Sequence, residues 1–148
     1  MISLTFYGLD QFVVGQLSNE MGVSLANLYE VSEDDILFIC PECCVYHKGI
    51  DQTSWNVIVN IEAPKKVQVL QDDVMSYVKS MLNGIATNVF IRFSYYSQDD
   101  VYEFIDETYP RFLEQSNIVD FDDEDEHDHD HDEDIFSGDI FKDFNKKD

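Results

Sequence analysis

The chain has 148 residues and a formal net charge of -22 at pH 7, with 31 acidic and only nine basic side chains. Nucleic acids and anionic lipids are bound mainly through Lys and Arg, so this charge argues against both as partners. The length and the 44% content of hydrophobic residues suit one globular domain with a tail. No apolar run could span a bilayer and the first residues lack the features of a secretory signal, so we expect a soluble, cytoplasmic protein.

The first third of the chain predicts a strand, a helix and a second strand. A short β-prone run over residues 4–7 ends at Gly8, and Asp10 is placed to cap a helix. The helix is indicated by apolar residues spaced three or four apart: Val14, Leu17, Met21, Leu25 and Leu28. The continuous apolar run at residues 36–39 predicts a buried strand that could extend to Tyr46.

The next part of the chain repeats this order. Alternating apolar and polar residues at 55–61 predict a strand, and Pro64 suits the first turn of a second helix, where its missing amide hydrogen costs nothing. We expect that helix to end at Gly84, because glycine readily adopts the left-handed conformation of a helix cap. A last strand is predicted at residues 89–93, and a capped third helix over residues 97–108.

This order of elements predicts an α/β (α+β) fold. Two strand–helix–strand units form a two-layer sandwich when both helices cover one face of a four-stranded sheet. The ferredoxin-like sandwich and the tautomerase fold share the order, and the spacing does not separate them. We assign residues 1–115 to this domain and residues 116–148 to an acidic, disordered tail. Within the tail, Asp120 to Asp134 contains eleven acids and no Lys or Arg.

The chain also resembles a family of short, uncharacterised bacterial proteins, a domain of unknown function with a tautomerase/MIF-like fold. The resemblance covers roughly residues 1–104 and lies in layout and pattern, not in fixed catalytic residues. It is carried by the segments LTFYGL, LFICPECCVYHKG, WNVIVNIEAPKKVQVLQDDVMSYVKSML and ATNVFIRFSYYSQDDVYEF. It implies a βαβ-βαβ arrangement and a small homo-oligomer, specifically a homotrimer.

The same resemblance implies an active-site pocket around the N-terminus, where this sequence departs from the tautomerase superfamily. Members of that superfamily carry proline after Met, which is removed, and the free proline amine acts as general base. Residue 2 here is Ile2, whose bulk should prevent removal of Met1 and leave a primary amine, which could also move a proton. Of the arginines that usually hold a carboxylate substrate, the chain offers only Arg92 and Arg111. We favour a non-catalytic protein, with a proton-transfer isomerase using Met1 and Arg92 as the alternative.

Three cysteines lie within five residues, and an odd number does not make a disulfide framework. The CPEC sequence from Cys40 to Cys43 resembles the CPxC of glutaredoxin-like proteins, whose chemistry needs a thiol at the start of a helix. No helical pattern follows here. With His47, the two thiols would make half of a zinc site, but the predicted domain offers no second half. We favour partly buried cysteines that act as small hydrophobic residues.

Three histidines alternate with aspartates inside the acidic run, at His127, His129 and His131. Imidazole and carboxylate ligands suit zinc or nickel, so a metal-binding tail is one hypothesis. A solvated spacer is the other, because the run has too few apolar groups to offset the entropy of ordering. Apart from such a metal in the tail, we expect no cofactor.

The last residues of the chain form an apolar segment beyond the acidic run. Phe136, Ile140 and Phe144 share one helical face, with Phe141 beside them. A helix of this length does not hold in water alone. We therefore hypothesise that the segment docks onto its own domain, a neighbouring subunit or another protein.

Overall fold

The computed structural model describes residues 1–114 of the chain. It divides into two units, Met1–Phe104 and a second that begins at Ile105. The elements of the first unit are β1 (Ile2–Tyr7), α1 (Gln11–Tyr29), η1 (Glu33–Asp35), β2 (Ile36–Ile39), β3 (Tyr46–His47), β4 (Ile50–Asp51), β5 (Asn56–Pro64), η2 (Lys65–Leu70), α2 (Gln71–Met81), β6 (Asn88–Tyr96) and η3 (Gln98–Asp100), where η denotes a 3-10 helix. The part of the second unit that is described, up to residue 114, contains neither helix nor strand.

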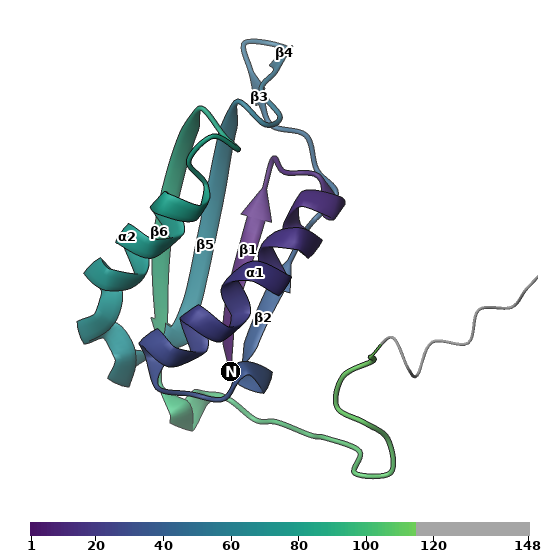
Figure 1. Ribbon diagram of the computed structural model, residues 1–148, viewed down its shortest axis with the longest axis vertical. Helices are drawn as coiled ribbons and strands as arrows, with labels where there is room; N and C mark the ends of the chain where they lie inside the picture. The colour runs from purple at the N-terminus through teal and green to yellow at the C-terminus, as the bar shows by residue number, and fades with distance from the viewer. Residues whose placement is uncertain (115–148) are drawn as a thin grey trace, which may run out of the picture. The chain divides into compact units, whose positions relative to one another are not determined.

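The first unit is built on a four-stranded sheet in the order β2-β1-β5-β6, with α1 and α2 on the same face (Figure 1). β1 pairs in parallel with β2, β5 pairs in parallel with β6, and the two pairs are joined by antiparallel pairing of β1 with β5. Each βαβ unit therefore keeps its two strands adjacent, whereas the ferredoxin-like sandwich splits them. The strand order confirms the predicted two-layer βαβ-βαβ sandwich and selects its tautomerase-like form.

Helix α1 forms as the sequence predicts. The Asp10 carboxylate accepts a hydrogen bond of 2.8 Å from the backbone N–H of Phe12, which satisfies one of the free donors of the first turn. Its predicted apolar stripe packs on the sheet, with Val14, Leu17, Met21 and Leu25 all buried. At the far end Glu30 adopts the left-handed conformation, with φ of 55°. The cap and the stripe together fix where α1 begins and which side faces the core.

The second helix begins later than the sequence predicts. Pro64 has an extended backbone (φ -59°, ψ 140°), so it ends β5 and does not open an α-helix. The 3-10 turns of η2 follow and bury Val67, and only then does α2 begin at Gln71. The helix ends at Met81 with Leu82 as its cap, and Gly84 (φ 85°) takes the left-handed conformation two residues further on.

The predicted third helix over residues 97–108 is wrong. Ser97 does cap a helical turn, accepting a hydrogen bond from the N–H of Asp99, but η3 stops at Asp100. Val101 is already extended, and Phe104 is 93% exposed. The apolar spacing there has no core to pack against within the described first unit, and a short helix without packing is not stable in water.

The strand at residues 36–39 does not extend to Tyr46 either. Pro41 lacks the amide hydrogen that a continued strand would use, and β2 ends at Ile39. The chain then forms the β3–β4 hairpin, which projects from one end of the sheet (Figure 1). Lys48 (φ 49°) and Gly49 (φ 79°) form its tip, and positive φ at both positions is typical of a type I′ turn.

Over residues 1–114, no helix has both the length and the apolar character needed to cross a membrane. The predicted domain boundary at residue 115 and the acidic tail beyond it stay predictions.

The Asp10 cap gives a direct test of how α1 is stabilised. We expect Asp10→Ala to lower the free energy of unfolding by about 1 kcal/mol, because the Phe12 N–H loses its acceptor. Urea unfolding followed by circular dichroism measures the change. The control is Asp100→Ala, which removes the same charge from an exposed position and should alter stability by less than about 0.5 kcal/mol. Equal losses in both variants would mean that net charge, not the cap, is responsible.

Candidate functional site

The face of the sheet opposite the two helices is covered by no described helix, and we call it the open face. Side chains alternate between the two faces along each strand, so the neighbours of buried residues point to the open face. The strand register sets these side chains in three rows: Leu37, Ser3, Glu62 and Ser94; then Ile39, Thr5, Asn60 and Arg92; then Tyr7, Ile58 and Phe90. The first row lies near Met1 and the third lies at the opposite end of the sheet.

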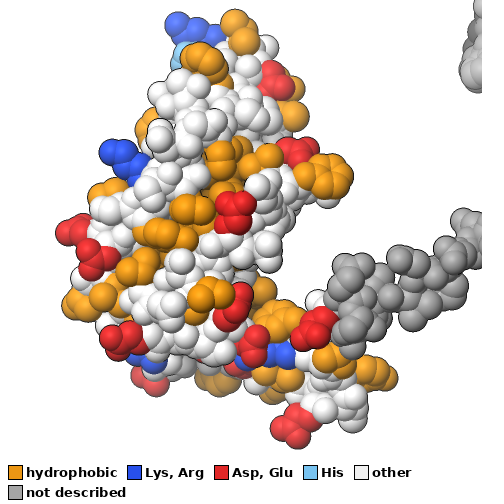
Figure 2. Space-filling model, viewed as in Figure 1, with side chains coloured by type: hydrophobic (Ala, Val, Ile, Leu, Met, Phe, Trp, Pro, Cys, Tyr) orange, Lys and Arg blue, Asp and Glu red, His pale blue; other side chains and the backbone are white. Residues whose placement is uncertain are grey.

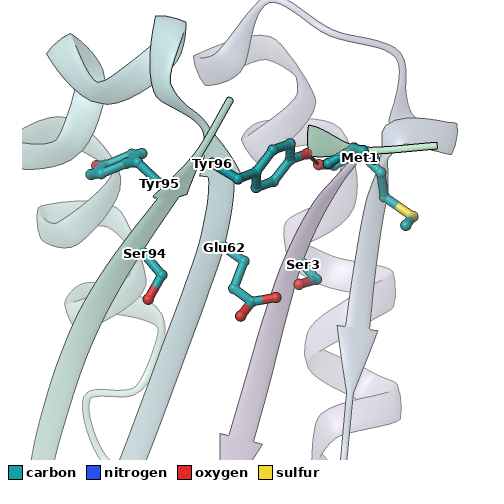
Figure 3. A pocket seen from close by; sticks show the side chains of 7 residues that line it. Met1, Ser3, Glu62, Ser94, Tyr95 and Tyr96 are labelled. Atoms are coloured by element: carbon teal, nitrogen blue, oxygen red, sulfur yellow. Dashed lines mark hydrogen bonds between the residues drawn. The ribbon is translucent and has the colours of Figure 1, made fainter. Parts of the chain in front are cut away.

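A pocket of about 350 Å³ lies at the Met1 end of the open face. It is lined by Met1, Ser3, Glu62, Ser94, Tyr95, Tyr96 and Val101. Tyr96 lies at the end of the edge strand β6, and its hydroxyl donates a hydrogen bond to the carbonyl of Met1. Its ring therefore reaches from the edge strand towards β1, and Glu62 and Ser3 lie beside each other next to it (Figure 3). The pocket is thus enclosed by residues from three neighbouring strands and the turn after β6.

The side chains that line this pocket carry a net negative charge. Glu62 is the one charged side chain among the lining residues, which include no Lys, Arg or His. Burial raises the pKa of the Tyr96 phenol, and the nearby carboxylates Asp35, Glu62 and Glu103 raise it further. Tyr96 therefore remains protonated at neutral pH and can donate its hydrogen bond to Met1.

The second tyrosine of the pocket is also held in its protonated form. Burial raises the pKa of the Tyr95 phenol, with a further contribution from Asp72. Its hydroxyl lies 3.0 Å from Oε1 of Gln71, to which it donates a hydrogen bond at the start of α2. Tyr95 therefore fixes the end of β6 to the helical layer, while Tyr96 fixes it to the start of β1.

The two predicted catalytic candidates, Met1 and Arg92, line different pockets. Arg92 lies in the second row of the open face and lines a hollow of about 400 Å³ with Ile58, Phe90 and Ile91. Within residues 1–114 its guanidinium has no hydrogen-bond or ion-pair partner. The described geometry therefore gives the pocket beside Met1 no arginine.

Ile2, the residue after Met1, is part of the core. It is 1% exposed and pairs with Ile36 at the start of β1. Its side chain faces the helices and not the pocket, as expected for a residue next to Ser3 on a strand.

The cysteines lie in the loop between β2 and β3. None of them begins a helix, and burial raises the pKa of the Cys40 thiol, with a smaller contribution from Asp10. The Cys40 thiol lies 3.5 Å from the carbonyl of Leu9, to which it donates. Cys40 and Cys43 are partly buried and Cys44 is exposed. A raised pKa opposes the thiolate that glutaredoxin-like chemistry needs.

Several predicted site residues lie outside the described part of the chain. They are the metal candidates His127, His129 and His131 and the docking candidates Phe136, Ile140, Phe141 and Phe144. Within residues 1–114, no three His, Cys, Asp or Glu side chains are grouped so that they could hold a metal ion. The metal and docking hypotheses for the tail therefore stay predictions.

Sequence reasoning missed Glu62 and Tyr96. The signal for Glu62 was present, because the strand alternation of residues 57–61 continues by one step and places it on the uncovered face. The sequence pattern does not show which residues of other strands lie beside Glu62. Ser3 and Ser94 come from strands far away in the sequence, and only the register of the sheet brings them together.

No protein-family model matches the chain, and no curated protein sequence matches it. Solved structures are similar in fold. A domain of unknown function (DUF1904) from Sebaldella termitidis superposes with a TM-score of 0.63 at 16% identity, covering 70% of this chain and 95% of that one. A protein of unknown function from Vibrio cholerae gives 0.59 at 15% identity, covering 69% and 83%.

A macrophage migration inhibitory factor-like protein from Entamoeba histolytica is also similar, with a TM-score of 0.52 at 10% identity, covering 69% of this chain and 93% of that one. These identities are low, so the likeness extends to the fold alone. It confirms the resemblance predicted from the sequence. The chain has the tautomerase-like fold of macrophage migration inhibitory factor, in common with a domain of unknown function.

Proposed function

We propose that this protein is a homo-oligomeric interaction protein that uses the tautomerase-like fold without tautomerase chemistry. The observation that carries the proposal is the open face of the sheet. Tyr7, Ile58 and Phe90 form a row across it, and Phe90 is 64% exposed. Rows of apolar side chains on a sheet are normally buried against another layer, and exposed ones mark interaction sites.

The partner that best fits this face is a second copy of the chain. Among residues 1–114, β6 is an edge strand of nine residues that pairs only with β5, so one of its edges offers N–H and C=O groups that no described strand pairs. Arg92 lies on the same strand beside Phe90, and aromatic residues and arginine are enriched at interfaces between proteins. A ring of three copies, as the family resemblance implies, would place the edge strand of one copy against the next and leave no free edge.

The pocket beside Met1 argues against a tautomerase reaction on a carboxylate substrate. Such a substrate needs a cation to hold it, whereas Glu62 is the charged side chain that lines this pocket, and Arg92 lines another. A carboxylate on the substrate would be repelled by Glu62. The isomerase alternative rests on one observation, the pocket that adjoins Met1, where an α-amine could act as general base.

The oligomer can be tested with a charge placed in the apolar row. We expect the native protein to elute as a multiple of the 17.2 kDa chain in size-exclusion chromatography with light scattering, and Phe90→Asp to shift it to one chain. Burying an unpaired carboxylate in an interface is strongly unfavourable. The matched control is Phe12→Asp, on α1, where the ring is 77% exposed on the helical layer.

The control should keep the mass of the native protein. Circular dichroism would show that both variants are folded. A native protein that is monomeric at all concentrations contradicts the proposal, as does a monomer produced equally by both substitutions.

Catalysis is tested with an enolisable 2-keto acid as the substrate. The reaction is monitored through the absorbance of the enol. We expect no rate above that of the buffer, because no Lys, Arg or His side chain lines the pocket beside Met1 to hold the substrate carboxylate. The mass of the intact protein should first establish whether Met1 is retained and carries the α-amine. Turnover that disappears on acetylation of that amine, and falls with Arg92→Ala, would support the isomerase alternative instead.

The contribution of the tail is separated by truncation. We expect a chain that ends at residue 118 to form an oligomer with the same number of copies as the full-length protein, because the proposed interface lies within residues 1–104. The same truncation should lose any protein partner that binds through residues 135–144, when full-length and truncated proteins are compared by affinity capture. A truncated chain that becomes monomeric would show that the tail, and not the open face, joins the copies.

A further inference from the structure

The pocket beside Met1 contains a carboxylate without a partner. Glu62 lies on β5 between Ser3 of β1 and Ser94 of β6, each its direct partner in the register. Among residues 1–114 its side chain makes no hydrogen bond and no ion pair, and the hydroxyls of Ser3 and Ser94 make none either. Three neighbouring side chains in the lining of one pocket therefore offer unused hydrogen-bond acceptors.

The walls of the pocket are largely apolar and aromatic. The ring of Tyr96 is held in place by its hydrogen bond to Met1, and Val101 also lines the pocket. The Tyr95 side chain points away from Glu62 and donates to Gln71 of α2, so Tyr96 supplies the aromatic ring that a ligand would meet (Figure 3). The face of a tyrosine ring attracts a cation through its negative π-electron density. Asp35 and Glu103 act on the Tyr96 phenol with the same sign of charge as Glu62.

We propose that this pocket binds a small organic cation, a primary or quaternary ammonium, with Glu62 as its counter-ion. The ammonium group lies against the Glu62 carboxylate, and a primary ammonium also donates to the hydroxyls of Ser3 and Ser94. Its alkyl part contacts Tyr96 and Val101. The volume of about 350 Å³ lies within the range of small-molecule sites in proteins.

Two other ligand classes fit the pocket less well. A carboxylate ligand would meet Glu62 with no Lys, Arg or His side chain in the lining to hold it. A metal ion needs several carboxylate or imidazole ligands, whereas the lining offers one carboxylate. An α-amino group on Met1 would add a positive charge at the rim, so the experiment includes an anion that such a charge would attract.

The pocket occupies the first row of the open face, whereas the apolar row of the proposed interface is the third. The pocket shares Ser94 and Tyr96 with the edge strand β6, so the oligomeric mass is measured on the same samples as binding. Binding without an oligomer, or an oligomer without binding, tells the two proposals apart.

The test is a titration of the isotope-labelled full-length protein followed by nuclear magnetic resonance, at constant ionic strength. The probes are n-butylammonium chloride, tetramethylammonium chloride and sodium pyruvate. We expect saturable shifts of the amide signals of Ser3, Glu62 and Ser94 with the two ammonium salts and none with pyruvate. Glu62→Gln should weaken ammonium binding at least tenfold, because a charge-assisted contact becomes neutral.

The matched control is Glu20→Gln, which removes the same charge from the exposed surface of α1 and should leave the affinity unchanged. Ser94→Ala is a second variant in case Glu62→Gln does not fold, and it should weaken n-butylammonium more than tetramethylammonium, which has no N–H to donate. Shifts that are unsaturable, spread over the surface and equal in Glu62→Gln would overturn the proposal in favour of general attraction by the net charge. Saturable binding of pyruvate at the same signals would also overturn it.

Discussion

The antiparallel pairing of β1 with β5 is the contact on which the rest of this structure depends. It joins two βαβ units, each with its own parallel pair, into one sheet with a helical side and an open side. The register of this pairing places Leu4 opposite Ile61 and Phe6 opposite Val59, and all four side chains are buried beneath the helices. A shift by one residue would turn those side chains to the open face and expose the core.

The same register composes the open face. It puts Glu62 between the strands that carry Ser3 and Ser94, and it puts Arg92 one row further on, in a separate hollow. One end of the face thus carries the Glu62 carboxylate of the pocket, and the other carries the apolar row of Tyr7, Ile58 and Phe90. Glu62 and Arg92 carry charges of opposite sign. Acidic side chains far outnumber basic ones in the protein, and few basic ones lie on the helical side shown in Figure 2. Arg92 is an exception to that pattern.

Much of the fold could be predicted because its signals are local. The cap at Asp10, the stripe of α1 and the alternation along β5 each lie within one element, and each is found where the sequence places it. The third helix failed because its apolar spacing is a local pattern as well, but Phe104 and its neighbours meet no core in the first unit. The strand order could not be read from spacing, since both candidate folds share the same order of elements. The pocket could not be read either, because three strands contribute to it and their register is a property of the assembled sheet.

The strand order also has a consequence for the time course of folding. Within each half, the parallel pair is separated only by its own helix and connecting segments, so each half gains its contacts from one stretch of chain. The β1–β5 pairing instead brings together the first strand and a strand that begins only at Asn56, and closing a longer loop costs more entropy. Contacts at long sequence separation slow folding, so formation of the β1–β5 pairing should limit the folding rate. Until β1 and β5 pair, each has an unpaired edge, and pairing between different chains would begin at these two edges.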